Sequence, residues 1–454
     1  MINLTLNKEV TPAMLLKFQS YDTELKSKIK NKTATVGIIG LGYVGLPTAC
    51  YYAAKGFRVT GFDVSTEKVN SLNSGISYIN DISNEQLHEI VSTNFFEATT
   101  DMKMLGMMDI ILICVPTPIN DVKEPNLTYV NAAGNTIAQH VTKGSLVILE
   151  STTYPGTTER FIVAPLVKRG FKVGETVFVA YSPERIDPGN KEYDLTNTPK
   201  VIGGMTKKCS EIGSEFIGDN AHLVNGVRVA ELSKIFENTF RWINTALVNE
   251  LAVLCKEMDI DIWETIDAAS SKPYGFMKFT PGIGVGGHCI PVDPYYLTFK
   301  AKKQGQRTKM IELAGEINDG MVHYSYVRIL ELLAENGKLM KNASIVVLGA
   351  AYKKDIGDLR ESPIVRLIEK LQDKVKNLNI IEPHSQSKEI LINGKKLPNS
   401  KYNVDIVKNA DLVVIGTPHS CFDWEQVFQV SNLIFDSKNI MEEQGYVSDK
   451  ITKL

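Results

Sequence analysis

A glycine-rich stretch that ends in a cysteine and an aspartate is the part of the sequence best suited to chemistry. Residues 281–294 read PGIGVGGHCIPVDP, with four glycines ahead of Cys289 and Asp293 four residues after it. Such glycines let the backbone approach a ligand closely. Pro291 and Pro294 lack an amide donor, so we expect no regular structure after the thiol and Asp293 on a short, stiff segment. We interpret the stretch as a loop that presents a thiol; a surface turn with a small buried cysteine is the alternative.

A second motif predicts a dinucleotide site near the N-terminus. An apolar strand at 35–39 leads into GLGYVG at 40–45, an apolar helix at 46–55 and a second strand at 57–62. In this context Gly40 allows a tight turn, Gly42 lets backbone approach a pyrophosphate, and Gly45 lets the helix pack on its strand. Asp63, eighteen residues after Gly45, can accept hydrogen bonds from the ribose of NAD and would repel the extra phosphate of NADP. The predicted cofactor is therefore NAD, and the predicted cofactor-binding residues here are Gly40, Gly42, Tyr43, Val44, Gly45 and Asp63.

Polar residues follow the next predicted strands, at 109–115, 145–150 and 176–181. In an open α/β sheet the carboxyl ends of the strands face the ligand crevice. Thr117, Thr152 and Glu184 are therefore predicted site residues, although Thr152 could equally be a helix N-cap. Lys68 could neutralise the acidic end of the cofactor site, and its alternative is a solvated helix lysine.

A long apolar helix is predicted over residues 225–258, where Leu, Ile and Phe recur at steps of three and four. Such a helix usually forms a central spine and often a subunit interface. Lys234 and Asn238 lie one turn apart on it and so share a face. The alternative for this pair is a surface position without function.

The remaining sequence predicts a second α/β section. A strand at 343–349 precedes a polar segment and a helix that opens near 363, and further strands are predicted at 378–381 and 412–416, without a second GxGxxG. The predicted fold class is α/β, with a Rossmann-type NAD domain, a long central helical region and a C-terminal α/β ligand-binding domain. The predicted boundaries are 1–32 for an N-terminal extension, 33–220, 221–330 and 331–454.

The charge, the apolar runs and the cysteines of the sequence exclude several classes of function. The net charge of −2 gives no field that would recruit nucleic acid or anionic lipid. The longest apolar runs, such as 110–115, are strand-length, and residues 1–32 have no apolar segment typical of a secretory signal. We expect a cytoplasmic protein without membrane or nucleic-acid partners. The six cysteines include no CxxC pair, so no disulfide framework and no metal site are predicted, and the five other than Cys289 are expected to be buried.

Together these segments resemble one family, the UDP-glucose / UDP-mannuronate dehydrogenases. The resemblance covers residues 33–440 in the family's order and rests on GLGYVGLP at 40–47, ESTTYPGTT at 150–158, SPERIDPGN at 182–190, AELSKIFEN at 230–238, PGIGVGGHCIPVDPYYL at 281–297 and AYKKDIGDLRESP at 351–363. It implies an N-terminal NAD domain, a central helix at a homodimer interface and a C-terminal UDP-binding domain. The implied reaction oxidises a sugar C6 hydroxymethyl to a carboxylate with two NAD.

The resemblance also implies roles for the polar residues. Cys289 would add to the aldehyde intermediate as a thiohemiacetal, which loses a second hydride to give a thioester. Lys234 would favour the thiolate and, with Asn238, stabilise the oxyanion. Asp293 and Thr152 would hold water and Glu184 would act as general base, with the division of proton transfer between Asp293 and Glu184 left open. The implied catalytic set is Cys289, Lys234, Asn238, Asp293, Glu184 and Thr152.

Substrate recognition is implied by motif position. Tyr274, Phe276, Lys278 and Lys353 would contact phosphate and uracil, and Arg360 would reach NAD from the C-terminal domain; for each basic residue the alternative is a solvated charge. Lys438 stands where the family often has Arg, which puts a bidentate contact there in doubt.

The segment 182–190 indicates which sugar is bound. It is similar to the branch that acts on UDP-N-acetylhexosamines, whereas glucose-specific members carry Phe-Leu after the glutamate and an acid where Pro188 stands. Arg185 would contact the acetamido group or the neighbouring subunit. The resemblance is closest to UDP-N-acetylglucosamine 6-dehydrogenases, which feed capsule, lipopolysaccharide and other surface polysaccharides; UDP-N-acetylmannosamine and UDP-glucose are the alternatives. A single-step hydroxyacid dehydrogenase or a non-catalytic NAD scaffold would not require the catalytic set named above.

Overall fold

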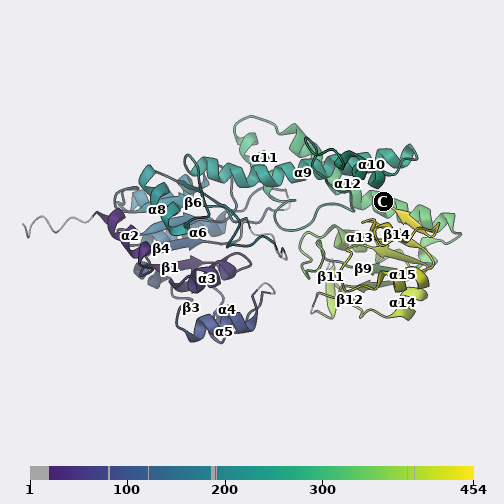
Figure 1. Ribbon diagram of the computed structural model, residues 1–454, viewed down its shortest axis with the longest axis horizontal. Helices are drawn as coiled ribbons and strands as arrows, with labels where there is room; N and C mark the ends of the chain where they lie inside the picture. The colour runs from purple at the N-terminus through teal and green to yellow at the C-terminus, as the bar shows by residue number, and fades with distance from the viewer. Residues whose placement is uncertain are drawn as a thin grey trace, which may run out of the picture. The chain divides into compact units, whose positions relative to one another are not determined.

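The computed structural model describes residues 20–79, 82–120, 122–185, 190, 192–385, 387–392 and 394–454 (Figure 1). These residues form two compact units. One unit contains the chain up to Pro118 together with Asn126–Lys234, and the other contains Ile119–Pro125 together with Ile235–Leu454. The long helix α9 (Val227–Glu257) begins in the first unit and ends in the second.

The first unit is built on an eight-stranded sheet with the order β3-β2-β1-β4-β5-β6-β7-β8. All neighbouring pairs are parallel except β6 and β7. The order reverses direction at β1, which lies between β2 and β4, and ligands of open α/β sheets bind at such a switch point. The predicted Rossmann sheet is confirmed. Its strands are β1 (Thr35–Ile39), β2 (Arg58–Phe62), β3 (Phe96–Thr99), β4 (Ile110–Ile113), β5 (Leu146–Leu149), β6 (Phe178–Tyr181), β7 (Lys200–Gly204) and β8 (Ala221–Leu223).

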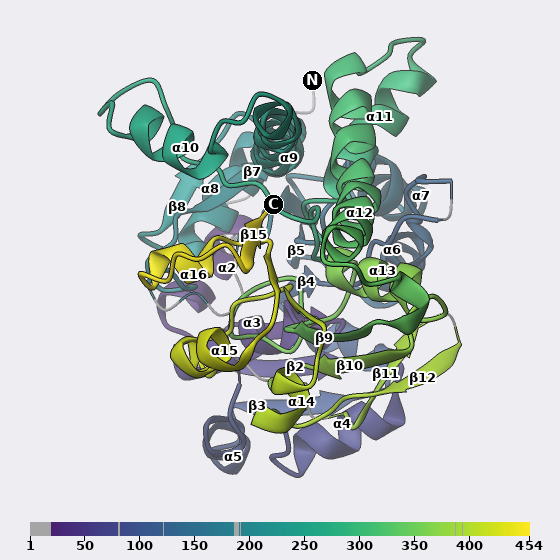
Figure 2. The same ribbon diagram turned by 90° about the vertical axis from the view of Figure 1, so that its right-hand side faces the viewer.

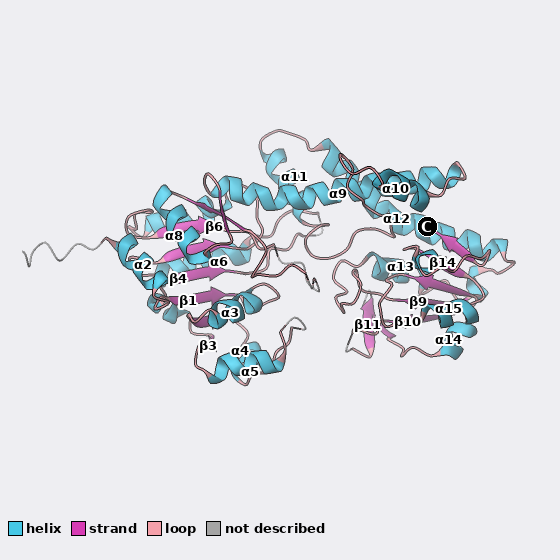
Figure 3. Ribbon diagram, viewed as in Figure 1, coloured by secondary structure: helices cyan, strands magenta, loops and turns pink. Residues whose placement is uncertain are grey.

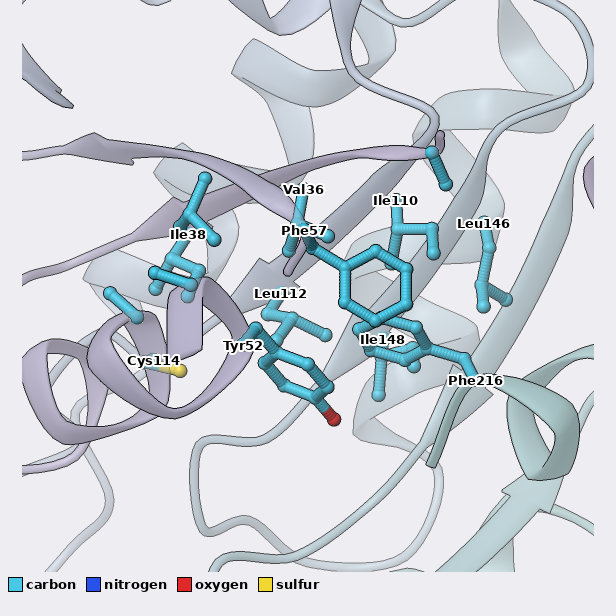
Figure 4. Packing of buried hydrophobic residues seen from close by; sticks show 14 of the residues in the cluster. Val36, Ile38, Tyr52, Phe57, Ile110, Leu112, Cys114, Leu146, Ile148 and Phe216 are labelled. Atoms are coloured by element: carbon cyan, nitrogen blue, oxygen red, sulfur yellow. The ribbon is translucent and has the colours of Figure 1, made fainter. Parts of the chain in front are cut away.

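Helices pack on this sheet, and the side chains between helices and sheet form an apolar core. Side chains of the central strands, such as Ile38 and Ile148, are buried against aromatic rings from the covering helices (Figure 4). Tyr52 stacks on Phe216 with ring centroids 4.4 Å apart. Each buried Ile or Phe side chain contributes about 1.5–3 kcal/mol. The helices of this unit are α2 (Tyr21–Lys30), α3 (Gly45–Ala54), α4 (Thr66–Asn73), α5 (Asn84–Ser92), α6 (Thr128–His140), α7 (Ala164–Lys168) and α8 (Lys207–Ile217).

Helix α2 is the described part of the predicted N-terminal extension. It packs along α8, and its residues Leu25 and Ile29 are buried in the core of the first unit. Lys28 Nζ also lies 2.8 Å from Asp109 Oδ1 at the start of β4. Residues 1–19 of the extension lie outside the described residues.

The second unit begins with long helices and continues with a section in which helices alternate with the strands of a five-stranded parallel sheet (Figure 3). Helices α12 and α13 pack on one face of the sheet, and α14 and α15 pack on the other (Figure 2). The sheet order is β10-β9-β13-β14-β15. The elements are α10 (Ile262–Ser270), α11 (Asp293–Lys303), α12 (Lys309–Glu335), β9 (Ser344–Leu348), α13 (Pro363–Leu371), β10 (Asn377–Ile381), β11 (Glu389–Ile392), β12 (Lys395–Pro398), α14 (Val404–Lys408), β13 (Leu412–Ile415), α15 (Trp424–Val430), β14 (Ile434–Asp436), α16 (Ile440–Glu443) and β15 (Ile451–Lys453).

Two local expectations were wrong. Asp293 opens the eleven-residue helix α11 instead of lying on an irregular segment. Pro294 fits there because amides in the first helical turn have no acceptor within the helix. Cys421 is exposed and Cys50 is partly exposed, so not all five non-loop cysteines are buried. None of the described helices has both the length and the apolar character that a membrane crossing requires.

Candidate active site

The glycine turn after β1 has the geometry that a dinucleotide needs. Gly40 has φ of 92°, and its amide donates to Phe62 O at 2.8 Å. A Cβ on Gly45 would lie 1.8 Å from Gly40 O, so only glycine lets α3 begin so close to the turn. A Cβ on Gly42 would meet no atom within 4 Å. Helix α3 begins directly after this turn without a side-chain cap, so the positive end of its dipole lies where a phosphate would bind.

Asp63 lies beside this turn at the end of β2. Its Oδ2 accepts from Leu41 N at 3.1 Å, and its Oδ1 accepts from Ser65 N at 3.0 Å. Lys68 Nζ lies 4.0 Å from Asp63 Oδ2 and is half-exposed. The carboxylate is therefore fixed at the switch point, where the ribose of NAD would lie. The other predicted cofactor residues in this unit are exposed Tyr43, Val44 at the N-cap of α3, and partly buried Thr117 after β4.

The ends of β5 and β6 bring Thr152 and Glu184 to one edge of the sheet. Leu149 and Tyr181 are partners in the parallel register, and each predicted residue follows its strand by three positions. Thr152 is partly exposed, and Glu184 Oε1 accepts from the amide of Arg185 at 2.6 Å. The two side chains thus emerge where the crevice of an α/β sheet forms.

Lys200, which the sequence analysis did not single out, binds Glu184 from β7. The antiparallel register pairs Tyr181 with Gly203, and its continuation sets Glu184 opposite Lys200. Lys200 Nζ lies 2.7 Å from Glu150 Oε1 and 3.4 Å from Glu184 Oε2. Burial opposes protonation of Lys200, but the charges of Glu150 and Glu184 raise its pKa well above the usual value. Burial likewise raises the pKa of Glu150, against the attraction of Lys200.

Helix α9 carries both Lys234 and a second buried carboxylate. Glu231, one turn earlier, accepts from Gly156 N at 2.7 Å and from both the amide and the hydroxyl of Thr158 at 2.8 Å. Burial raises the pKa of Glu231 in spite of these donors. The start of α9 is therefore tied to the segment that follows Thr152, and Lys234 is largely buried there.

The thiol loop of the second unit is anchored to α9. Both Val292 N and Asp293 N donate to Cys289 O, at 3.1 and 2.8 Å, so the chain turns directly after the half-buried thiol. The Asp293 side chain is buried and its Oδ2 accepts from Asn238 Nδ2 at 2.5 Å. Two of the predicted catalytic residues, Asn238 and Asp293, thus form one hydrogen-bonded pair.

The glycines of the loop pack against the C-terminal sheet domain. A Cβ on Gly286 would lie 2.5 Å from Tyr352 Cβ. Gly287, with φ of 88°, donates its amide to Arg360 O at 3.3 Å. At Gly282 a Cβ would meet the amino group of Lys438, whose pKa is lowered because burial outweighs the attraction of Asp436. At these positions the close approach that glycine allows is to the protein itself.

The predicted substrate residues lie on several loops. Tyr274 and Phe276 are exposed after α10, and Lys278 Nζ pairs with Asp267 at 2.5 Å. Arg360 pairs with Asp358 at 2.6 Å. Lys353 is partly buried after β9, and Arg185 donates to Pro199 O at 2.7 Å. Residues 186–189, including Pro188, lie outside the described residues.

The predicted catalytic, cofactor-binding and substrate-binding residues are distributed over the two units. The first holds the glycine turn with Asp63, Lys68 and Thr117, together with Thr152, Glu184, Arg185 and Lys234. The second holds Asn238, Tyr274, Phe276, Lys278, Cys289, Asp293, Lys353 and Arg360. The sequence contained a signal for Glu150, which opens the quoted ESTTYPGTT segment, but none that joined it to Lys200.

Domain comparisons match three successive parts of the chain to one family. Residues 34–217 match the NAD binding domain of the UDP-glucose/GDP-mannose dehydrogenase family. Residues 228–320 match its central domain, and residues 346–443 match its UDP binding domain.

Individual relatives are similar over nearly their whole length. The UDP-N-acetyl-D-mannosamine dehydrogenase of Pyrococcus horikoshii is 34% identical over 90% of this chain and 96% of its own. The UDP-N-acetyl-D-glucosamine 6-dehydrogenase of Salmonella typhi is 34% identical over 85% of this chain and 90% of its own. A solved UDP-D-ManNAc dehydrogenase structure from Pyrococcus horikoshii has a TM-score of 0.81 at 32% identity, covering 92% of this chain and 98% of the other.

Proposed function

Because the chain belongs to the UDP-glucose/GDP-mannose dehydrogenase family, we propose that it oxidises the C6 hydroxymethyl of UDP-N-acetyl-D-glucosamine to a carboxylate. Family membership makes it an NAD-dependent nucleotide-sugar dehydrogenase. The choice of sugar rests on the segment around Glu184 and Arg185 and on the Salmonella typhi relative. UDP-N-acetyl-D-mannosamine is the second candidate, because relatives of equal identity carry that name.

The observation that carries the proposal is the anchored thiol loop. Cys289 follows four glycines, and its carbonyl accepts from the amide of Asp293, the first residue of α11, whose buried carboxylate accepts from Asn238. A thiolate held there would add to the aldehyde carbon of the half-oxidised sugar and give a thiohemiacetal. Loss of its C–H as hydride gives a thioester, which water cleaves to the carboxylate and the free thiol. NAD, bound at the glycine turn, would accept one hydride in each oxidation, so two NADH form and one water is consumed.

The buried polar residues would supply the charge and proton steps. Lys234 and the amide of Asn238 would stabilise the oxyanion that forms at each stage. Glu184 would take the proton from the hydrolytic water, and Lys200 opposite it would hold its carboxylate in place. Asp293 and Thr152 would position that water.

NADH yield tests this proposal. Purified protein is given NAD and limiting UDP-N-acetylglucosamine, UDP-N-acetylmannosamine, UDP-N-acetylgalactosamine or UDP-glucose, each in a separate reaction. We expect two NADH per sugar, with UDP-N-acetylglucosamine fastest. We expect Cys289→Ser to stop at the aldehyde or a covalent intermediate, while the matched control Cys50→Ala keeps the full yield. The mechanism would be overturned if the unaltered protein formed one NADH per sugar and an aldehyde or ketone product. A faster reaction with UDP-N-acetylmannosamine than with UDP-N-acetylglucosamine would show that the mannosamine epimer is the substrate.

A homodimer is the proposed assembly. Within the second unit, α9 exposes large apolar side chains at helical spacing. They are Phe236, Phe240, Leu247, Leu251 and Leu254, and each is 39–66% exposed. Contiguous apolar surface of this kind is typical of an interface. We expect Phe236→Glu to convert a dimer to a monomer in light scattering, whereas the exposed control Leu391→Glu in β11 leaves the mass unchanged. A wild-type protein that is monomeric at micromolar concentration would contradict this.

A further inference from the structure

We propose that Asp355, His384 and His419 form a binding site for a divalent transition-metal ion, with Cys421 as the fourth ligand. The three loops that carry these residues follow β9, β10 and β13. These strands are parallel neighbours in the order β10-β9-β13, so their carboxyl ends converge at one edge of the sheet. All of these residues lie in the second unit.

The spacing of the ligand atoms suits a small cation. One donor atom from each of Asp355, His384 and His419 lies within 4.8 Å of the others. His384 Nε2 is 3.7 Å and His419 Nδ1 is 4.0 Å from Asp355 Oδ1, and Cys421 Sγ is 4.0 Å from His384 Nε2. Ligands bound at about 2.0–2.3 Å around a tetrahedral zinc lie roughly 3.3–3.7 Å apart. The donor atoms, up to 4.8 Å apart, would therefore draw together by as much as about 1–1.5 Å when the ion binds.

The residues around the cluster fix the tautomer that a metal requires. His419 is fully buried, and its Nδ1 accepts from the amide of Asp355 at 2.9 Å. The ring proton therefore sits on Nε2 and is donated to Glu382 Oε2 at 3.0 Å. A carboxylate that accepts from the second nitrogen is the usual partner of a metal-binding histidine. Ser420 similarly orients the Asp355 carboxylate, through its amide and hydroxyl at 2.7 Å each.

Metal binding has one competing interaction. The cation would replace the Asp355 amide at Nδ1 of His419, because a neutral imidazole has a single acceptor nitrogen. Asp355 and His384 are partly exposed and Cys421 is exposed, so water can solvate the released amide and the ion can enter from solvent. Two imidazoles and a thiolate favour zinc, nickel or cobalt over magnesium or calcium.

The site would also stiffen the segment proposed to bind substrate. Glu382 accepts from the amides of Ala350 and Ala351 at 2.8 Å, and Asp355 lies five residues further along the same segment. Lys353 lies between them. A metal at Asp355 would therefore join this segment to the loops after β10 and β13. This consequence rests on the proposed function, whereas metal binding does not.

Metal titration of the full-length protein tests the site without substrate. Chelator-treated protein is titrated with Zn²⁺ by calorimetry and with Co²⁺ by absorption. We expect one ion per chain, a tetrahedral cobalt spectrum and a thiolate-to-cobalt charge-transfer band. His384→Ala should weaken binding at least tenfold, and Cys421→Ser should remove the charge-transfer band. His323→Ala on α12 is the matched control and should change neither.

Surface variants are used because the buried His419 could be needed for folding. Binding that is absent, or that is equal in the wild type, His384→Ala and His323→Ala, would overturn the site. The four-ligand proposal would also be overturned if the wild type showed no charge-transfer band and Cys421→Ser kept the tetrahedral spectrum, because Cys421 would then not be a ligand. None of these measurements depends on turnover, so their failure is distinct from failure of the dehydrogenase assignment.

Discussion

Replacing Lys200 by Met should destabilise the first unit strongly. The ammonium lies between two carboxylates, 2.7 Å from Glu150 and 3.4 Å from Glu184, and the side chain of Glu150 is only 1% exposed. Removing one partner of a buried ion pair leaves an uncompensated charge and costs about 3–5 kcal/mol. The exposed pair Lys172–Glu175, 3.5 Å apart, is the matched control, for which Lys172→Met should cost less than about 1 kcal/mol.

The loss should depend on pH with a definite sign. Burial raises the pKa of Glu150 in the folded protein above its unfolded value. A carboxyl of this kind favours folding where it is protonated, and this contribution is lost as pH rises through the folded pKa. Without Lys200 the attraction that opposes burial is gone, so the pKa of Glu150 rises further. The cost of Lys200→Met should therefore be larger at pH 8 than at pH 5, which is nearer the unfolded glutamate value of about 4.3.

Hydrogen exchange is the suitable assay, because a chain of two units need not unfold in one step. Protection of the β5, β6 and β7 amides reports the local free energy of opening. We expect the double variant Lys200→Met with Glu150→Gln to regain most of the protection that Lys200→Met alone loses, because a neutral amide at position 150 needs no counter-charge. The reasoning is refuted if Lys200→Met behaves like Lys172→Met, or if its effect is the same at pH 5 and pH 8.

Two glycine substitutions test the two halves of the site separately. Gly45→Ala would place a Cβ 1.8 Å from Gly40 O, so NAD affinity measured by calorimetry should fall at least tenfold; unchanged affinity would contradict the packing of α3. Gly286→Ala would place a Cβ 2.5 Å from Tyr352 Cβ, so it should displace the thiol loop and lower kcat at least tenfold while NAD affinity is kept. An unchanged kcat would show that the loop is not held by this contact.

The sequence by itself determined the elements whose signals are local. The long helix was predicted over 225–258 and is observed as Val227–Glu257, because an apolar stripe of period 3.6 is visible in any short window. The turn at Gly40–Gly45 was predicted for the same reason, because its glycines lie within six residues of one another and are required by steric constraints within that turn. These local features also carried the family resemblance.

Only the tertiary structure decided which distant residues meet. Lys200 faces Glu184 because β7 runs antiparallel to β6, and no local pattern states that direction. Asp355, His384 and His419 converge because β10, β9 and β13 are neighbours in the sheet although they are separated in the chain. Periodicity and turn chemistry act over a few residues, whereas strand order is set by the packing of the whole core. The buried charges and the proposed metal site depend on that order.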